Sequence, residues 1–291
     1  MSIRQQVKSL CLKVLSFMGR KLKRTPLARS VLLNRIHAAW SLWLHGAREV
    51  TVGDFKVRID PRDRFIAKKL VLYDGFEEKE MSLLCGLVNP GDCVLDVGAN
   101  IGLYALHLSR AVGETGRVFA AEPDPDNRAL LETNLEMNGC ANVTVLPYAL
   151  GDAPGSAELY QVNDNRGYLS FADLGGTGES RTVEVRRGDD VLKELRVRPA
   201  LAKIDVEGAE PRVFSGLGEF KPDTIMFEFV PDHLRALDHD PADFLEGLVE
   251  EGYGLEIIDP DSGERIALAP RSLLAYSESD KSREYNILAR R

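Results

Sequence analysis

The chain carries the sequence Val-Leu-Asp-Val-Gly-Ala-Asn-Ile-Gly at residues 94–102, and the mainly apolar residues 103–108 follow it directly. The first half has the composition of a buried strand, and the small residues after it are typical of a loop that leads into a helix. A strand that ends in glycines lets a ligand approach the backbone, and the start of the next helix offers unpaired N–H groups. This stretch therefore predicts a strand, a loop and a helix that bind a nucleotide cofactor.

An acidic residue at the end of the next predicted strand supports this interpretation. Glu122 closes the predicted strand 116–122 and lies twenty positions after Gly102. An acidic side chain at such a strand end can accept hydrogen bonds from both hydroxyls of a ribose. The cofactor is therefore expected to contain a ribose.

The spacing within the loop distinguishes between cofactors. A dinucleotide site needs G-x-G-x-x-G, in which the second glycine makes room for pyrophosphate. Here Asn100 replaces the middle glycine, Gly102 comes one residue early, and Asp96 lies two residues before Gly98. A carboxylate and an amide suit a cofactor with a cationic amine and no phosphate, which describes S-adenosylmethionine. The alternative is an ordinary turn whose glycines only allow tight packing.

Composition and charge divide the chain into two parts. With 291 residues, 44% of them hydrophobic, it has enough apolar material for one catalytic-sized α/β domain with an appendage. Residues 1–48 hold ten Lys or Arg and no acid. The other 27 of the 37 basic residues and all 45 acids lie in 49–291, which gives that part a formal net charge of −18. We therefore predict a basic helical extension at 1–48 and a catalytic domain at 49–291, and expect no binding of nucleic acid by the domain.

Three roles are open for the basic extension: a targeting segment, a helix at a membrane surface, or a helical cap on the domain. A signal peptide is disfavoured because Lys13 interrupts the early apolar run, and no apolar stretch reaches the roughly eighteen residues that span a membrane. The amphipathic pattern suits peripheral binding to a membrane or to a protein partner. Packing on the domain explains it equally well.

The four cysteines bear on the compartment. They have no C-x-x-C spacing and lie in or beside apolar segments, at Cys11, Cys85, Cys93 and Cys140. Buried reduced thiols are expected rather than metal ligands or disulfides. We therefore predict a cytoplasmic protein, with peripheral membrane contact left open by the extension.

Strand and helix patterns alternate beyond residue 49, as in a parallel sheet covered on both faces. Further strands are predicted at 142–146, 200–205 and 224–229, a helix at 124–137, and a mobile loop or hairpin at 164–180. Acids mark the ends of four strands. Because ligands bind at the carboxyl ends of parallel strands, these acids are expected to converge: Asp96, Glu122, Asp205 and Glu228.

Several motifs of the chain resemble those of FkbM-type methyltransferases. They are Asp96–Gly102, Ala121-Glu122-Pro123-Asp124, Ala149-Leu150-Gly151-Asp152 and Lys203-Ile204-Asp205-Val206-Glu207-Gly208-Ala209-Glu210, with further similarity at 73–77 and 226–229. The resemblance covers about residues 52–290, and the block 203–210 is its most specific piece. One departure is Arg-Gly-Asp-Asp at 187–190, where the family usually has Leu-Asp.

The resemblance implies the class I methyltransferase fold, a Rossmann-like seven-stranded α/β sheet whose last strand is antiparallel and could be supplied by 285–289. It also implies S-adenosylmethionine-dependent O-methylation of a hydroxyl on a sugar or another small metabolite. The cofactor-binding residues expected from the loop and the matching motifs are Glu77, Asp96, Gly98, Ala99, Asn100, Gly102, Glu122, Pro123, Leu150 and Asp152.

Methyl transfer to a hydroxyl requires alignment of the oxygen with the methyl carbon and sulfur, and removal of a proton. The candidate bases are Asp205, Glu207, Glu210, Glu228 and His233. We assign the catalytic role to Asp205, Glu228 and His233, although Glu210 could be only the acid of a helix's first turn and His233 only a solvated loop residue. Clustered carboxylates could also hold Mg²⁺, but no metal ligand is assigned, because so few ligands cannot be identified from sequence.

Three functions are compatible with these patterns. The first is a small-molecule O-methyltransferase. A nicotinamide-dependent oxidoreductase is disfavoured by Asn100 and the short glycine spacing, and binding of NAD in a thermal-shift assay would revive it. A non-catalytic adaptor that retains the fold is disfavoured because the loop, Glu122 and the strand-end acids are all present.

Deletion of residues 1–48 distinguishes the roles of the extension. If the extension binds membranes, the truncated chain should no longer sediment with anionic vesicles, and binding of the full chain should weaken with added salt. Affinity for the cofactor should be unchanged in the same preparations. Equal sedimentation of both proteins would favour the helical cap.

Overall fold

The computed structural model describes residues 49–60, 63, 66–73, 76–162, 169–173, 180–280 and 284–291. The predicted basic extension lies outside these residues. The described chain falls into two compact units, one ending at Phe76 and the other beginning at Glu77. Within the described residues, no helix combines the length and the apolar character needed to cross a membrane.

The smaller unit contains a hairpin and one helix. Strand β1 (Glu49–Val52) pairs antiparallel with β2 (Phe55–Arg58), and α3 (Ile66–Tyr73) follows. The turn between the strands uses Gly53, whose φ of +54° is accessible to glycine at little cost.

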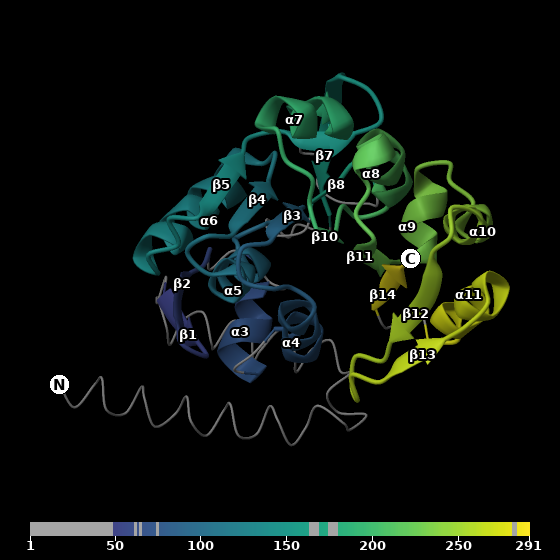
Figure 1. The fold of residues 1–291 in the computed structure, drawn as a ribbon, viewed down its shortest axis with the longest axis horizontal. Coiled ribbons are helices and arrows are strands. Elements are labelled where there is room, and N and C mark those ends of the chain that lie inside the picture. The colour runs from purple at the N-terminus through teal and green to yellow at the C-terminus, as the bar shows by residue number, and fades with distance from the viewer. Residues whose placement is uncertain are drawn as a thin grey trace. The chain divides into compact units, whose positions relative to one another are not determined.

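The larger unit is built on an eight-stranded sheet with the order β13-β12-β14-β11-β10-β3-β4-β5 (Figure 1). Its strands are β3 (Cys93–Val97), β4 (Arg117–Ala121), β5 (Val143–Leu146), β10 (Leu201–Ile204), β11 (Thr224–Phe229), β12 (Gly254–Ile258), β13 (Arg265–Ala267) and β14 (Tyr285–Arg290). The five strands from β5 to β11 are parallel, and β14 runs antiparallel between β11 and β12. The predicted class I sheet with its antiparallel last strand is confirmed, and β13 adds an edge strand that the prediction of seven omitted.

Helices cover both faces of this sheet. They are α4 (Glu78–Gly86), α5 (Leu103–Val112), α6 (Pro125–Met137), α7 (Gly188–Leu195), α8 (Glu210–Leu217), the 3-10 helix η2 (Gly218–Phe220), α9 (Pro231–Ala236), α10 (Pro241–Glu250) and α11 (Pro270–Glu278). From the centre of the sheet the chain runs to one edge through α5 and α6, and to the other through α8 and α10 (Figure 1). Because parallel crossovers are right-handed, the two directions place α5 and α6 on one face and α8 and α10 on the other.

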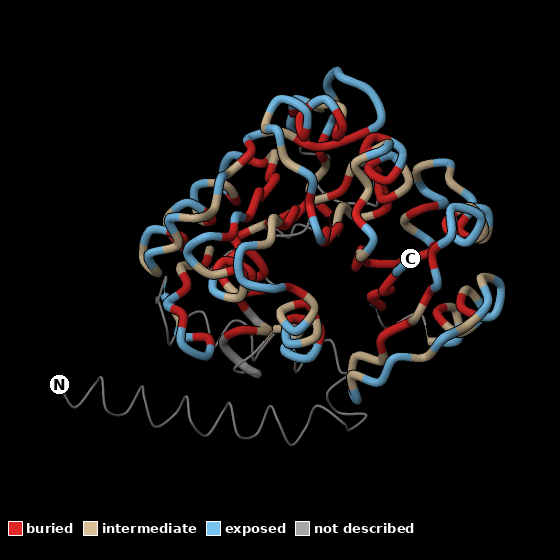
Figure 2. The backbone as a smooth tube through the Cα atoms, viewed as in Figure 1, coloured by how far each residue is buried: buried red, intermediate tan, exposed pale blue. Residues whose placement is uncertain are grey.

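The two faces of the central strands differ in chemistry. Toward α8 and α10 the strands present apolar residues, and Phe227 of β11 packs edge-to-face against Phe214 of α8 and Phe244 of α10 at centroid distances of 5.3 and 5.5 Å. Alternate residues of the same strands, among them Asp96 and Lys203, point to the α5 face. Both sets are buried, as the red strands in Figure 2 show. The fold therefore has one apolar core layer and one buried face that carries charge.

A second sheet is formed by the part of the chain between β5 and β10 of the central sheet. Its order is β6 (Ala149–Gly151), β9 (Ser180–Arg187), β7 (Gly155–Gln161), β8 (Leu169–Ser170). In the segment 164–180, predicted as a loop or hairpin, residues 169–170 form β8 and pair with β7. Strands β7 and β9 were missed, because only one residue of each is buried and their apolar pattern is weak.

The loop after β3 packs directly on the end of β10. Gly98 has φ +81°, and a Cβ built on it would lie 1.8 Å from the carbonyl oxygen of Asp205. Gly102 has φ +91°, and its Cβ would lie 2.4 Å from the Cδ1 of Leu131 in α6. Gly98 is therefore required by packing against backbone as well as by its conformation, whereas Gly102 is favoured mainly by its left-handed conformation, since the end of the Leu131 side chain can shift.

We expect Gly98→Ala to lower the free energy of unfolding by about 2–4 kcal/mol, the sum of an overpacking cost and a left-handed backbone cost. Gly139→Ala is the matched control, since Gly139 has φ +67° but nothing within 4 Å of the added carbon. The free energy of unfolding of Gly139→Ala should fall by only about 1 kcal/mol. Urea denaturation measures both, and equal losses would contradict the close approach of the two loops.

Candidate active site

The four strand-end residues predicted to converge do so through the register of the sheet. Val97 pairs with Ala121 on one side and Ile204 on the other, and Ile204 pairs with Phe227. The next residue of each strand therefore lies in one row across the carboxyl ends: Gly98, Glu122, Asp205 and Glu228. Asp96 lies two rows earlier, opposite Lys203, and its side chain is on the same face of the sheet as this row.

Glu122 holds the glycine loop in place. Its carboxylate accepts hydrogen bonds from the backbone N–H of Asn100 at 2.8 Å and of Asp124 at 2.9 Å. Asn100 adopts φ +51°, and its side chain accepts the N–H of Ile101 at 2.8 Å. Burial raises the pKa of Glu122 to about 7 against the lowering effect of the two N–H donors. A carboxylate has about four acceptor positions, so two remain for ligand hydroxyls.

Asp96 is buried beneath the same loop. Burial raises its pKa to about 7, although nearby Lys203 and the N–H of Ala105 lower it. Its Oδ2 atom is buried and has no hydrogen-bond partner among the described residues. Asp96 therefore adds an acceptor close to the start of α5.

Lys203 is the buried cation of this region. Its side chain is 1% exposed, its Nζ lies 2.9 Å from Asp205 Oδ2, and the same atom lies 5.0 Å from the centroid of the Tyr104 ring. Burial lowers the pKa of Lys203, but the negative charges of Asp205, Glu77 and Glu228 outweigh it, and the pKa is raised. The amine is therefore charged at neutral pH.

Glu77 joins this region from the start of α4. It has φ +44°, and its carboxylate accepts a hydrogen bond from the Tyr104 hydroxyl at 2.7 Å. Its negative charge helps to raise the pKa of Lys203, so Glu77 lies close to the charged face, and its binding of the cofactor stays a prediction.

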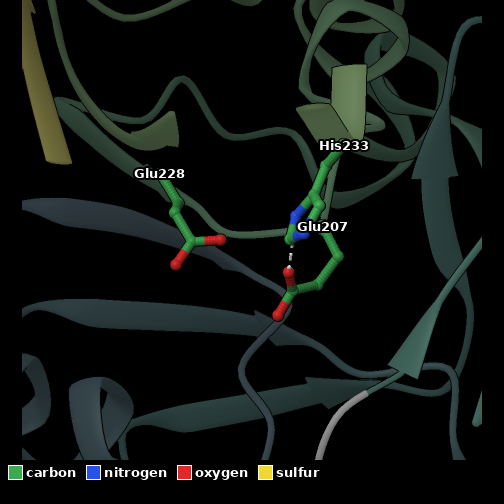
Figure 3. A group of neighbouring side chains, drawn as sticks. All are labelled: Glu207, Glu228 and His233. Atoms are coloured by element: carbon green, nitrogen blue, oxygen red, sulfur yellow. Dashed lines mark ion pairs between the residues drawn. The ribbon is translucent and has the colours of Figure 1, made fainter. Parts of the chain in front are cut away.

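The loop after β10 brings Glu207 to His233. Glu207 and Gly208 have φ of +53° and +102°, and a Cβ on Gly208 would lie 2.5 Å from the carbonyl oxygen of His233 in α9. Glu207 Oε2 lies 3.2 Å from His233 Nδ1 (Figure 3). Burial lowers the pKa of His233, partly offset by nearby acids, Glu210 first, so the imidazole is neutral at neutral pH.

The Glu207 backbone is also held from the second sheet. Ser170 of β8 donates its hydroxyl to the carbonyl oxygen of Glu207 at 3.1 Å and accepts the N–H of Ala172 at 3.1 Å. A left-handed non-glycine residue is strained, and strain of this kind concentrates at functional sites.

Glu228 completes a group of three with Glu207 and His233. One ligand atom from each lies within 4.8 Å of the others, and Figure 3 shows a carboxylate oxygen of Glu228 pointing toward the imidazole. Burial raises the pKa of Glu228 well above its usual range, and the charges of Asp205, Glu207 and Glu284 raise it further.

Other predicted residues lie apart from this group. Glu210, one of the candidate bases, is buried, and its Oε1 accepts the N–H groups of Val206 and Gly208 at 3.1 and 3.3 Å, so it stabilises the loop between them. Leu150 is buried in the apolar core, and Asp152 is exposed beside β6. Pro123 is half-buried, and its carbonyl oxygen accepts a hydrogen bond from Arg128 at 3.1 Å.

Two side chains of the site were not assigned from the sequence. Glu207 was only a candidate base, and Lys203 was noted only within the motif at 203–210. A lysine at the centre of a parallel strand is a usable signal, since a buried cation needs acidic partners. The left-handed conformation of Glu207 leaves no such trace in the sequence.

The strand order, the glycine loop and the acid at the end of β4 together define a class I methyltransferase that uses S-adenosylmethionine. The model of the FkbM methyltransferase domain matches residues 96–255, more than half of the chain, and the chain belongs to that family.

Curated relatives agree with this assignment. The hexuronic acid methyltransferase AglP of Haloferax volcanii is 28% identical over 196 residues, which cover 67% of this chain and 77% of that protein. The 31-O-demethyl-FK506 methyltransferase FkbM of Streptomyces tacrolimicus is 35% identical over 161 residues, which cover 45% of this chain and 61% of that protein. The chain thus spans less than two thirds of the second relative's length.

A solved precorrin-6y C5,15-methyltransferase from Geobacter metallireducens aligns with a TM-score of 0.43 and 15% identity over 74% of this chain and 89% of that one. The fold assignment rests on the strand order of this chain.

The residues present fit S-adenosylmethionine. Glu122 offers carboxylate acceptors for two ribose hydroxyls, and Asp96 Oδ2, which has no hydrogen-bond partner within the described part of the chain, adds negative character near the loop, as a cationic ligand requires. The cofactor supplies an electrophilic methyl group on a sulfonium.

We expect Glu122→Gln to weaken S-adenosylmethionine binding at least tenfold, because charge-assisted hydrogen bonds contribute about 1.5–3 kcal/mol each. Since the pKa of Glu122 is raised to about 7, the carboxyl is largely protonated at pH 6 and ionised at pH 8. The wild-type affinity should therefore rise over this interval, and the variant should lose part of the rise. Calorimetry measures both, with Asp126→Asn as the control, because Asp126 is an exposed acid of α6 four positions after Glu122.

Proposed function

We propose that the protein transfers the methyl group of S-adenosylmethionine to a hydroxyl of a sugar or another small metabolite. The observation that carries this proposal is the group of Asp205, Glu207, Glu228 and His233 in and just beyond the row of strand ends that holds Glu122. The relative from Haloferax volcanii is named for a hexuronic acid, which supports a sugar acceptor. The relative from Streptomyces tacrolimicus is named for a 31-O-demethyl compound, which supports an oxygen nucleophile.

His233 is the proposed proton acceptor. A neutral imidazole can take a proton from a hydroxyl, and Glu207 at 3.2 Å orients the ring and stabilises the imidazolium that forms. Asp205 is held by Lys203 and orients the acceptor. Family membership favours methyl transfer over a nicotinamide-dependent reaction, and the buried acids favour a working site over an adaptor that only retains the fold.

A cytoplasmic location with the basic extension as the point of membrane or protein contact remains part of the proposal. The charge separation between residues 1–48 and the acidic remainder supports it.

We expect His233→Ala to lower turnover about 10²-fold or more while the affinity for S-adenosylmethionine stays unchanged, since a placed base contributes about 10²–10⁴-fold. Asp205→Asn should behave similarly. The assay is mass-spectrometric detection of a methylated product from a panel of hydroxylated sugars, with cofactor affinity measured by calorimetry on the same variants.

Full turnover in His233→Ala would move the proton-accepting role to a carboxylate. Loss of cofactor binding in Asp205→Asn would instead assign that residue to the methionine end of the cofactor. Absence of product with every hydroxyl acceptor, alongside intact cofactor binding, would contradict O-methyl transfer.

A further inference from the structure

Glu228 is a buried carboxylate whose charge is not neutralised by a direct partner. Its residue is 9% exposed, and within the described residues its carboxylate makes no hydrogen bond and no ion pair. The nearby cation, Lys203, is paired with Asp205 at 2.9 Å. A buried charge without a partner is costly, so this position favours a cationic ligand.

The neighbours of Glu228 provide further ligand atoms. Glu207 and His233 each offer one within 4.8 Å of the others, Glu207 from the loop after β10 and His233 from α9 (Figure 3). The separation of 3.2 Å between Glu207 Oε2 and His233 Nδ1 matches the roughly 3 Å between neighbouring ligands that each lie about 2.1 Å from one ion.

We propose that Glu207, Glu228 and His233 bind a first-row divalent cation at the acceptor end of the site. Two carboxylates alone would suit Mg²⁺ or Ca²⁺, whereas imidazole favours transition metals, and the mixed set suits an ion such as Mn²⁺ that accepts both. The geometry leaves the remaining coordination positions to water or to oxygen atoms of an acceptor.

The cation would take part in the proposed methyl transfer to a hydroxyl. Its role at the acceptor end therefore rests on the proposed function. An acceptor oxygen bound to a divalent cation loses its proton more readily, and the cation offsets the repulsion that the acids would exert on an alkoxide. With the lone pair of His233 used as a ligand, His233 acts through the cation in place of accepting the proton directly, and the proton of the hydroxyl passes to a water molecule at one of the remaining coordination positions.

Titration of the full chain with Mn²⁺ alone tests the site, with bound and free ion separated by electron paramagnetic resonance. We expect one bound Mn²⁺ per chain, and at least tenfold weaker binding in Glu228→Gln and in Glu207→Gln. Glu207 is partly exposed, so its variant should fold even if the buried substitution does not.

Asp232→Asn is the matched control, because it removes one acid from α9 beside His233 but is 58% exposed and paired with Arg235 at 3.0 Å. It should bind Mn²⁺ like the wild type. Absence of stoichiometric binding, or wild-type binding by folded Glu207→Gln, would overturn the cation site.

Failure of this inference and failure of the proposed function are distinguishable. Methyl transfer to a hydroxyl by a protein that binds no Mn²⁺ would overturn the cation site alone. Mn²⁺ binding that depends on Glu207 and Glu228, in a protein that methylates no hydroxyl, would support the site and contradict the proposed function.

Discussion

The buried ion pair of Lys203 and Asp205 is the interaction on which the charged face of the sheet depends. Lys203 lies in the middle of the sheet, beside Asp96 in the neighbouring strand and within reach of the fields of Glu77 and Glu228. Several acids could not remain together in a low-dielectric environment without this one ammonium group. Replacing the lysine would leave uncompensated buried charge, which costs more than the pair itself contributes.

Close backbone packing fixes the position of this charged face. The glycine loop touches the end of β10 through Gly98, and the loop after β10 touches α9 through Gly208. At each of these contacts there is no room for a side chain on the glycine. The contact at Gly98 holds the glycine loop close to Asp205, and the contact at Gly208 holds Glu207 close to His233. The glycines in these loops allow two parts of the protein to pack closely. They affect ligand binding indirectly, through the side chains that this packing positions.

The sequence predicted the elements that rest on strong periodicity or on local caps. Strand β11 was predicted with its observed bounds, and α6 begins after Asp124, which accepts N–H groups of Asp126 and Asn127 as its Asp-Pro sequence indicates. The convergence of Asp96, Glu122, Asp205 and Glu228 followed from the rule that parallel strands share an edge. Strands β7 and β9 were missed because their pairing depends on contacts distant in sequence and not on alternation.

The approach of Glu207 to His233 was equally inaccessible to pattern analysis. It depends on two consecutive left-handed residues and on a hydrogen bond from Ser170, more than thirty positions away. The motif at 203–210 marked the segment without indicating which of its acids turns toward the site. The register of the strands determines which residues lie at the carboxyl end of the sheet. The backbone conformation of the loop after each strand then determines which side chains come into contact.

The buried acids impose an electrostatic cost that binding can recover. Burial raises the pKa of Asp96 and Glu122 to about 7 and raises that of Glu228 well above its usual range. An acid whose pKa is raised on folding contributes most to stability below its unfolded pKa, and this contribution falls as the pH rises toward the folded pKa. At neutral pH these groups therefore oppose folding, and any ligand that stabilises their ionised forms gains affinity from relief of that cost. The hydroxyls and sulfonium of S-adenosylmethionine would stabilise ionised Glu122 and Asp96, and the proposed divalent cation would stabilise ionised Glu228. The buried negative charges that lower the stability of the fold therefore favour these two ligands.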